Sequence, residues 1–187
     1  PVLLKNYTPL RRSKLCGGKI INNGEIEKAF ININPFINKT PLIRSECLSK
    51  DYKASIFLKL EHHQKTGSFK IRGATNAILN LTSEQRNRGV VGVSTGNHGR
   101  GLASAASAAG IKCIICMSQL VPKNKIEGIQ AHGAEVRIIG NSQDDAQIEV
   151  DRLVKEEGMT MIPPFDHSDI IAGQGTLGLE ILKDLPD

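Results

Sequence analysis

Apolar positions along this chain alternate between two kinds of spacing. Short continuous apolar runs, typical of strands buried on both faces, occur at Ser55–Leu60, Gly89–Val93, Lys112–Met117, Ala134–Ile139 and Met159–Ile162. Between them, apolar residues recur every three to four positions, which predicts helices over Ser68–Leu81, His98–Ala109, Pro122–His132, Ser142–Glu157 and Gly175–Leu185. Residues 1–30 show no clear period, and we expect a basic, polar lead-in there.

Local signals support several of these boundaries. Pro122 is suited to the start of a helix, and Gly133 to a position just past its end. Ser142 is a natural N-cap, followed by Asp144 and Asp145 in the first turn, where acidic side chains stabilise the helix dipole.

The alternation of strands and helices predicts an α/β fold with open parallel sheets in three layers, helices covering both faces. Residues 89–162 are long enough for a small open-sheet domain. Residues 31–88 and 163–187 then belong to a larger domain that the small one interrupts. A parallel sheet needs another strand after the last helix, so we expect the larger domain to be incomplete within this chain.

Composition narrows the classes of function. Of 187 residues, 40 % are hydrophobic and 23 % charged, which excludes a disordered tail. We expect no membrane span, because no apolar run approaches the roughly 18–20 residues that one needs. The net charge of +5 is scattered, and the only aromatics are five Phe and two Tyr. Nucleic-acid binding is therefore a minor alternative, resting on the lead-in residues Lys5, Arg11, Arg12, Lys14 and Lys19.

Four cysteines are too few for a disulfide scaffold. Cys113 and Cys116 form a CxxC pattern, but it lies within an apolar run with strand character. Positions i and i+3 of a strand point to opposite faces, so the two thiols diverge. No second Cys/His pair lies at ligand spacing, and no metal site is predicted. Buried thiols in a reducing compartment indicate a cytoplasmic protein.

The first loop with candidate chemistry is Lys65–Ala74 (KTGSFKIRGA). With Ser68 as N-cap, Lys70 falls in the first helical turn, where the dipole favours the neutral amine and attracts an anion. Lys70 is thus a candidate nucleophile that could form a Schiff base with a carbonyl compound. The alternative is an ordinary solvent-exposed lysine, and the residues of this loop alone favour that alternative.

The second loop is Ser94–Gly99 (STGNHG), at the carboxyl end of the predicted strand Gly89–Val93. Ligands of open parallel sheets bind at that edge, and hydroxyls, an amide and free backbone N–H groups suit a carboxylate. An ordinary capped turn is the alternative. Gly92–Gly96 also fits the GxSxG pattern of serine hydrolases. We reject a hydrolase because Asp166 and His167 are adjacent, a poor geometry for the triad.

Together, the two loops resemble those of fold-type II pyridoxal-phosphate enzymes, which include serine/threonine dehydratases and serine racemases and share the tryptophan synthase β-like fold. Further matches are Lys39–Leu42, Lys59–Glu61, Pro122 with Lys125, and Ala172–Thr176. The phrases VSTGNHGR (Val93–Arg100) and SQDDAQIEVDRL (Ser142–Leu153) are most similar to the hydroxyectoine-utilisation dehydratases, a threonine dehydratase-like branch. The resemblance covers Phe36 to Asp187.

The resemblance implies pyridoxal 5′-phosphate (PLP) as cofactor and roles for six residues. Lys70 would form the Schiff base with the cofactor and remove the substrate's α-proton. Phe69 would pack against the cofactor pocket, and Asn97 would hydrogen-bond the 3′-hydroxyl of the pyridine ring. The substrate carboxylate would lie against Ser94, Thr95, Asn97 and His98. Thr95 occupies the position of the second acid/base residue of racemases and keeps a hydroxyl.

The implied reaction is α,β-elimination on a hydroxylated amino acid such as threonine or serine, giving a 2-oxo acid and ammonia. A homodimer is also implied. Racemisation and β-replacement are alternatives within the family. The family's glycine-rich phosphate loop, the partner of the pyridine nitrogen and the acidic metal site are expected beyond Asp187, so we expect this chain alone to be inactive. An inactive ligand-binding or oligomerisation remnant is the alternative of another class.

Overall fold

The computed structural model describes residues 21–185, so the expected basic lead-in at residues 1–20 lies outside the described part. The strands are β1 (Leu42–Arg44), β2 (Phe57–Lys59), β3 (Val90–Val93), β4 (Cys113–Met117), β5 (Glu135–Ile138) and β6 (Thr160–Met161). The helices are α1 (Asn23–Ile33), α2 (Glu46–Tyr52), α3 (Lys70–Leu79), α4 (Ser83–Arg88), α5 (Asn97–Ala108), α6 (Lys123–Gln130), α7 (Gln143–Glu157) and α8 (Ser168–Asp184), with short 3₁₀ turns at Asn34–Phe36 and Glu61–His63. In the described part, no helix combines the length and the apolar character needed to cross a bilayer.

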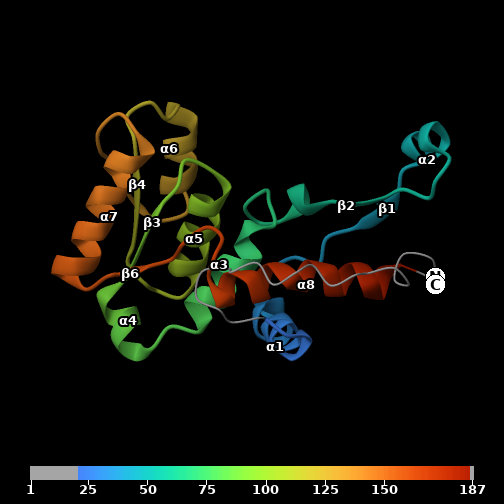
Figure 1. The fold of residues 1–187 in the computed structure, drawn as a ribbon, viewed down its shortest axis with the longest axis horizontal. Coiled ribbons are helices and arrows are strands. Elements are labelled where there is room, and N and C mark those ends of the chain that lie inside the picture. Colours follow the sequence, from blue (N-terminus) through green and yellow to red (C-terminus); the bar gives the residue numbers. More distant parts are fainter. Residues whose placement is uncertain (1–20, 186–187) are drawn as a thin grey trace, which may run out of the picture.

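Four strands form a parallel sheet in the order β5-β4-β3-β6 (Figure 1). Val90 of β3 is in register with Cys113 of β4 on one side and with Thr160 of β6 on the other. Every residue of β3 and β4 is buried, which explains their continuous apolar character. The predicted α/β fold with a parallel sheet is confirmed.

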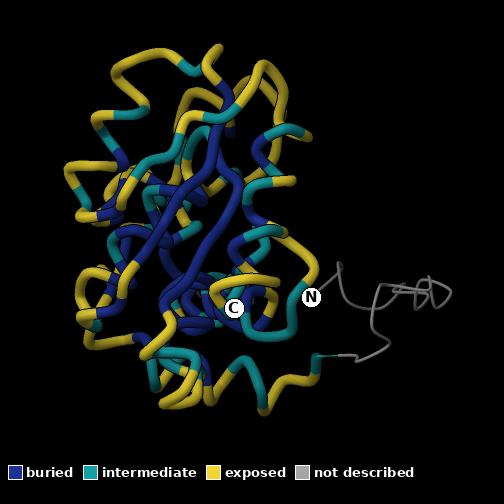
Figure 2. The backbone as a smooth tube through the Cα atoms, turned by 90° about the vertical axis from the view of Figure 1, so that its left-hand side faces the viewer, coloured by how far each residue is buried: buried dark blue, intermediate teal, exposed yellow. Residues whose placement is uncertain are grey.

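Helices cover both faces of this sheet, as predicted. On one face, Cys113 packs in a core with residues of α3, α5 and α6. On the other face, Cys116 packs against Val150 and Leu153 of α7. The thiols of the CxxC pattern therefore diverge as expected, and burial raises the pKa of Cys113 to about 12 and that of Cys116 to about 11. Figure 2 shows the strands of this sheet as the buried centre of the molecule.

The apolar run Ser55–Leu60, expected to be a strand of a parallel sheet, pairs antiparallel instead. Its strand β2 pairs antiparallel with β1, with Leu42 opposite Lys59, in a separate two-stranded sheet. The two strands are joined through the 7-residue helix α2. This hairpin extends beside α8, away from the four-stranded sheet (Figure 1).

Helix α1 begins within the segment expected to be an aperiodic lead-in. Asn22 caps the helix, and its side chain and that of Glu25 form a reciprocal capping box. Ala29 and Ile33, spaced by one helical turn, are buried. The expectation that residues 1–30 form a lead-in without a clear period is therefore wrong for residues 23–30. A short amphipathic helix begins there among polar residues.

Helix α8 begins at Ser168, seven residues before the predicted start at Gly175. His167 is its N-cap, with Nδ1 accepting a hydrogen bond from the Asp169 amide. A glycine of the added N-terminal part of α8 is a close contact point: a Cβ on Gly173 would lie 2.6 Å from the Gly73 Cα of α3. The short helices α2 and α4 were not predicted either.

Candidate active site

Lys70 is the first residue of α3, and its amine lies at the loop that joins β6 to α8. The Nζ donates a hydrogen bond to the Pro164 carbonyl at 2.9 Å. The ring centroid of Phe165 lies 4.4 Å from the same atom, and that of Phe69 lies 5.4 Å away. The fold thus holds the predicted lysine between two phenyl rings and a backbone carbonyl 94 residues further along the chain.

Burial lowers the pKa of Lys70. The sequence predicted this direction from the helix dipole, but desolvation is the cause in the structure. The predicted cap is wrong: Phe69 occupies the N-cap position and no side chain caps α3. The Ser68 hydroxyl is instead buried without a hydrogen-bond partner among the described residues, as is that of Thr66. Two buried hydroxyls in the segment just before Lys70 suit a polar ligand.

The loop Ser94–Gly99 follows β3 and opens α5. The Ser94 Oγ accepts hydrogen bonds from the Gly99 amide at 2.8 Å and from the Gly96 amide at 3.3 Å. The amides of Asn97 and His98, the first two of the helix, have no acceptor in the described part of the chain. The Asn97 side chain is exposed and Thr95 is half-buried. Ser94 therefore organises a helix N-terminus whose free amides can bind an anion.

The side chain of His98 points into the interior, unlike those of Thr95 and Asn97. Its ring is buried, and Nε2 lies 2.9 Å from the Ile162 carbonyl. A carbonyl only accepts, so Nε2 carries the proton and Nδ1 is left with no partner among the described residues. Burial lowers the pKa of His98, and the nearby Lys70 charge lowers it further. His98 is a neutral anchor for the segment that ends at Pro164, the acceptor for Lys70.

The two predicted loops meet where α3 and α5 begin. A Cβ on Gly101 of α5 would lie 3.1 Å from the Lys70 carbonyl carbon, so the helices approach closely at this point. Sequence reasoning found both loops but missed Pro164 and Phe165. Their position just after the predicted strand Met159–Ile162, at the carboxyl edge of the sheet, was a usable signal.

A buried ion network fixes α3 just behind Lys70. Arg72, with 0 % of its side chain exposed, pairs with Glu61 at 2.7 Å and with Glu180 of α8 at 2.7 Å. Lys59 of β2 also pairs with Glu180, at 2.7 Å. The two carboxylates raise the pKa of Arg72 despite its burial. The network ties the hairpin, α3 and α8 together.

Comparison with known proteins identifies the family. The profile of the pyridoxal-phosphate dependent enzymes matches residues 33–187. The chain belongs to this family. A Sinorhizobium fredii protein with a provisional threonine dehydratase name is 58 % identical over 87 % of this chain and 49 % of its own length. The catabolic L-threonine dehydratase TdcB of Staphylococcus aureus is 44 % identical over 89 % of this chain and 48 % of its own. The chain thus spans about half the length of the curated relatives it matches.

Solved structures agree with this family and fold. Maize serine racemase superposes with a TM-score of 0.87 at 33 % identity, over 90 % of this chain and 51 % of that one. The processed form of threonine deaminase isoform 2 from Solanum lycopersicum superposes with a TM-score of 0.81 at 34 % identity, over 89 % of this chain and 50 % of that one.

The residues around Lys70 fit the family's cofactor. An aldehyde reacts with a neutral amine, and burial makes the Lys70 amine easier to deprotonate. The unpartnered Ser68 hydroxyl and His98 Nδ1 are buried polar atoms that a polar ligand could satisfy. Lys70 would hold the cofactor's aldehyde carbon, and the exposed edge of Phe69 offers an apolar contact beside it.

Proposed function

We propose that this chain supplies the lysine-bearing half of an active site that eliminates water from a hydroxylated amino acid such as threonine or serine. The observation that carries the proposal is the meeting of Lys70 with the start of α5. A half-buried amine of lowered pKa, whose charge acts on the nearby His98 ring, accompanies a helix N-terminus with free amides. The net products are a 2-oxo acid and ammonia, because water lost from the β-carbon is returned when the enamine product hydrolyses.

Lys70 has two tasks in this proposal. Its Nζ would hold the aldehyde carbon of PLP, and as a free amine it would accept the substrate's α-proton. PLP, when bound, supplies an electron sink for the charge that develops at the α-carbon. A lowered pKa keeps a larger fraction of Lys70 neutral, and only the neutral amine can accept a proton.

The start of α5 orients the substrate. A carboxylate at this helix N-terminus would accept from the amides of Asn97 and His98, and the helix dipole adds to the attraction. Ser94 holds this turn in shape through its hydrogen bonds to the Gly96 and Gly99 amides. The proposal further has the Thr95 hydroxyl contact the substrate and the Asn97 side-chain amide contact the cofactor ring.

The test is a 2-oxo acid assay on full-length protein with added PLP and L-threonine or L-serine. We expect product from at least one of these substrates and none from Lys70→Ala protein of equal folded content. The same assay on Asn97→Ala should show a higher KM for PLP or substrate. If full-length protein releases no 2-oxo acid from either substrate, elimination is the wrong reaction.

Racemisation is the second candidate. Thr95 keeps a hydroxyl beside the candidate site, and the solved serine racemases are among the structures that this chain resembles. Chiral chromatography of the same L-serine reaction separates the two: D-serine indicates racemisation, and pyruvate indicates elimination. Thr95→Ala should leave elimination largely intact but abolish D-serine formation.

Three finer points belong to the same proposal. The sequence segments Val93–Arg100 and Ser142–Leu153 support a substrate derived from hydroxyectoine. Buried cysteines with raised pKa values support a reducing, cytoplasmic location. A homodimer is proposed from the family resemblance, and the mass of the full-length protein in solution tests it.

A further inference from the structure

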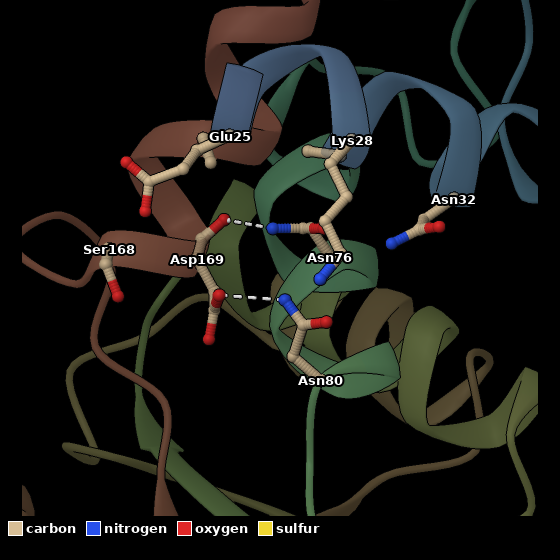
Figure 3. A pocket seen from close by; sticks show the side chains of 9 residues that line it. Glu25, Lys28, Asn32, Asn76, Asn80, Ser168 and Asp169 are labelled. Carbon is tan, nitrogen blue, oxygen red and sulfur yellow. Dashed lines mark hydrogen bonds between the residues drawn. The ribbon is translucent and has the colours of Figure 1, made fainter. Parts of the chain in front are cut away.

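A cavity of about 330 Å³ lies between α1, α3 and α8. Its polar lining comes chiefly from Glu25, Lys28, Asn32, Asn76, Asn80 and Asp169 (Figure 3). Lys70, the loop Ser94–Gly99 and Pro164 are not part of this lining. The cavity is therefore distinct from the candidate active site.

Asn76 carries a buried hydrogen-bond acceptor at this cavity. Only 2 % of the residue is exposed, and its Nδ2 donates to the Asp169 carbonyl at 2.8 Å. A carbonyl only accepts, so this bond fixes the orientation of the amide. The Oδ1 is then buried with no partner among the described residues. An unmet buried acceptor is unfavourable, and a ligand with an N–H donor would satisfy it.

Asp169 also lines this cavity. Its Oδ1 accepts a hydrogen bond from Asn80 Nδ2 at 2.8 Å (Figure 3), and its Oδ2 lies 3.8 Å from His167 Nδ1. Asn80 is the C-cap of α3, one turn after Asn76, so both amides contact Asp169 from the same side. Asn76 turns its Nδ2 toward Asp169, so its Oδ1 and the Asp169 carboxylate are two separate acceptors on residues that line one cavity, and an ammonium group can donate to both kinds of acceptor.

The opposite wall comes from α1. Lys28 and Asn32 are spaced i and i+4, so they share one face of the helix, and Figure 3 shows both extending toward α3. Glu25 lies one turn before Lys28 and accepts from the Asn22 amide at 3.0 Å. Lys28 lines the same cavity as Ser168 and Asp169, the first two residues of the 17-residue helix α8. A cation beside a helix N-terminus attracts a carboxylate.

We propose that the cavity between α1, α3 and α8 binds a free α-amino acid. Its ammonium group would lie between Asn76 Oδ1 and the Asp169 carboxylate, and its carboxylate would lie at Lys28. Lys28 on α1 and Asp169 on α8 carry opposite charges on two walls of the cavity, and such a pair favours a zwitterion over a simple cation or anion. Glu25 adds a second carboxylate on the α1 wall. This site goes beyond the proposed function, because the amino acid here is a ligand of a second site and not the substrate.

The test uses calorimetric titration with L-alanine, which has no β-hydroxyl to eliminate. Lys70→Ala protein without PLP cannot hold an amino acid through a Schiff base at the candidate active site, and thermal unfolding confirms that it is folded. We expect saturable binding of one L-alanine per chain. L-alaninamide, which lacks the carboxylate, and propionate, which lacks the ammonium, should each bind at least about tenfold more weakly, the equivalent of about 1.4 kcal/mol.

Two single changes locate the site. Lys28→Met and the isosteric Asp169→Asn, each in the Lys70→Ala protein, should weaken L-alanine binding about tenfold or more. Lys155→Met, which changes an exposed lysine of α7 far along the chain, is the matched control and should leave it unchanged. Absence of saturable L-alanine binding, or binding unaffected by both changes, overturns the proposal. Equal binding of L-alaninamide or of propionate overturns it too, since the site would then recognise a single charge.

Discussion

Arg72 and Glu180 face each other through two hydrogen bonds, from Nη1 to Oε1 at 2.7 Å and from Nη2 to Oε2 at 3.0 Å. The pair joins α3 to α8 in the interior, with 0 % and 4 % of the side chains exposed. Two parallel bonds between a guanidinium and a carboxylate give directional as well as electrostatic stabilisation. The pair therefore sets the position of α3, and with it the position of Lys70.

Removing one partner of this pair should be strongly destabilising. Glu180→Ala leaves the Arg72 and Lys59 charges buried, which costs about 3–5 kcal/mol for a buried pair. We expect a value near the lower end, because Glu61 still pairs with Arg72. Urea unfolding measures it. Glu84→Ala, which breaks an exposed pair with Arg88, is the control and should cost about 0.5 kcal/mol or less. Similar losses in both variants would contradict the role of the buried pair.

The close packing of α3 on α8 predicts opposite effects for two glycines of one helix. A Cβ on Gly173 would lie 2.7 Å from the Arg72 carbonyl, whereas one on Gly178 would meet nothing within 4 Å. Gly173→Ala should destabilise by about 1–3 kcal/mol, because backbone must move. Gly178→Ala should stabilise by roughly 0.5–1 kcal/mol, because alanine is the better helix former. The two denaturation midpoints should therefore move in opposite directions, and a shared direction would refute this packing.

The lowered pKa of Lys70 makes a prediction about pH. Between the lowered folded value and the ordinary 10.5, the unfolded chain binds more protons at this site. The contribution of Lys70 to the free energy of unfolding should therefore rise with pH across that window. Comparing wild type with Lys70→Met from about pH 7 to 10 measures it, and the difference should shift in favour of wild type as the pH rises. Lys155→Met, which removes an exposed lysine of α7, is the matched control.

His98 should act as a positioning residue for the loop that holds Lys70. His98→Leu leaves the Ile162 carbonyl without its donor and should cost about 1–3 kcal/mol. His98→Gln, which still offers an N–H, should recover part of that loss. Because the folded pKa of His98 lies below the ordinary 6.5, wild-type stability falls as the pH drops below that value. The advantage of wild type over His98→Gln should thus shrink from about pH 7 to pH 5, and an advantage independent of pH would contradict a neutral, buried ring.

The sequence predicted the parallel sheet well because its strands are buried on both faces. Val90–Val93 and Cys113–Met117 are uninterrupted apolar runs with glycines nearby, and their strands lie within one residue of the predicted ends. Ser142 and Gly158 delimit α7 as ordinary capping chemistry requires. Strand ends and helix caps of this kind depend on residues close in sequence, so the sequence alone predicts them.

Other features depended on contacts between distant segments. The helix predicted from Gly175 begins at Ser168 instead, and Gly173 and Gly175 lie in α8 at close contacts with Gly73 and Ile26. The partners of Lys70, at Pro164 and Phe165, follow from the order of strands in the sheet and not from spacing along the chain. The Ser68 cap failed because α3 begins one residue later than a capped helix would.

The central claim is that Lys70 is the residue that holds PLP, and chemical trapping tests it most directly. Purified protein is incubated with a substoichiometric amount of PLP, reduced with borohydride and mapped by peptide mass spectrometry. We predict that the phosphopyridoxyl mass is found predominantly on Lys70, and that Lys70→Arg protein loses this adduct without gaining it elsewhere. Label spread evenly over exposed lysines such as Lys123 and Lys155, with Lys70 unmodified, would contradict the account.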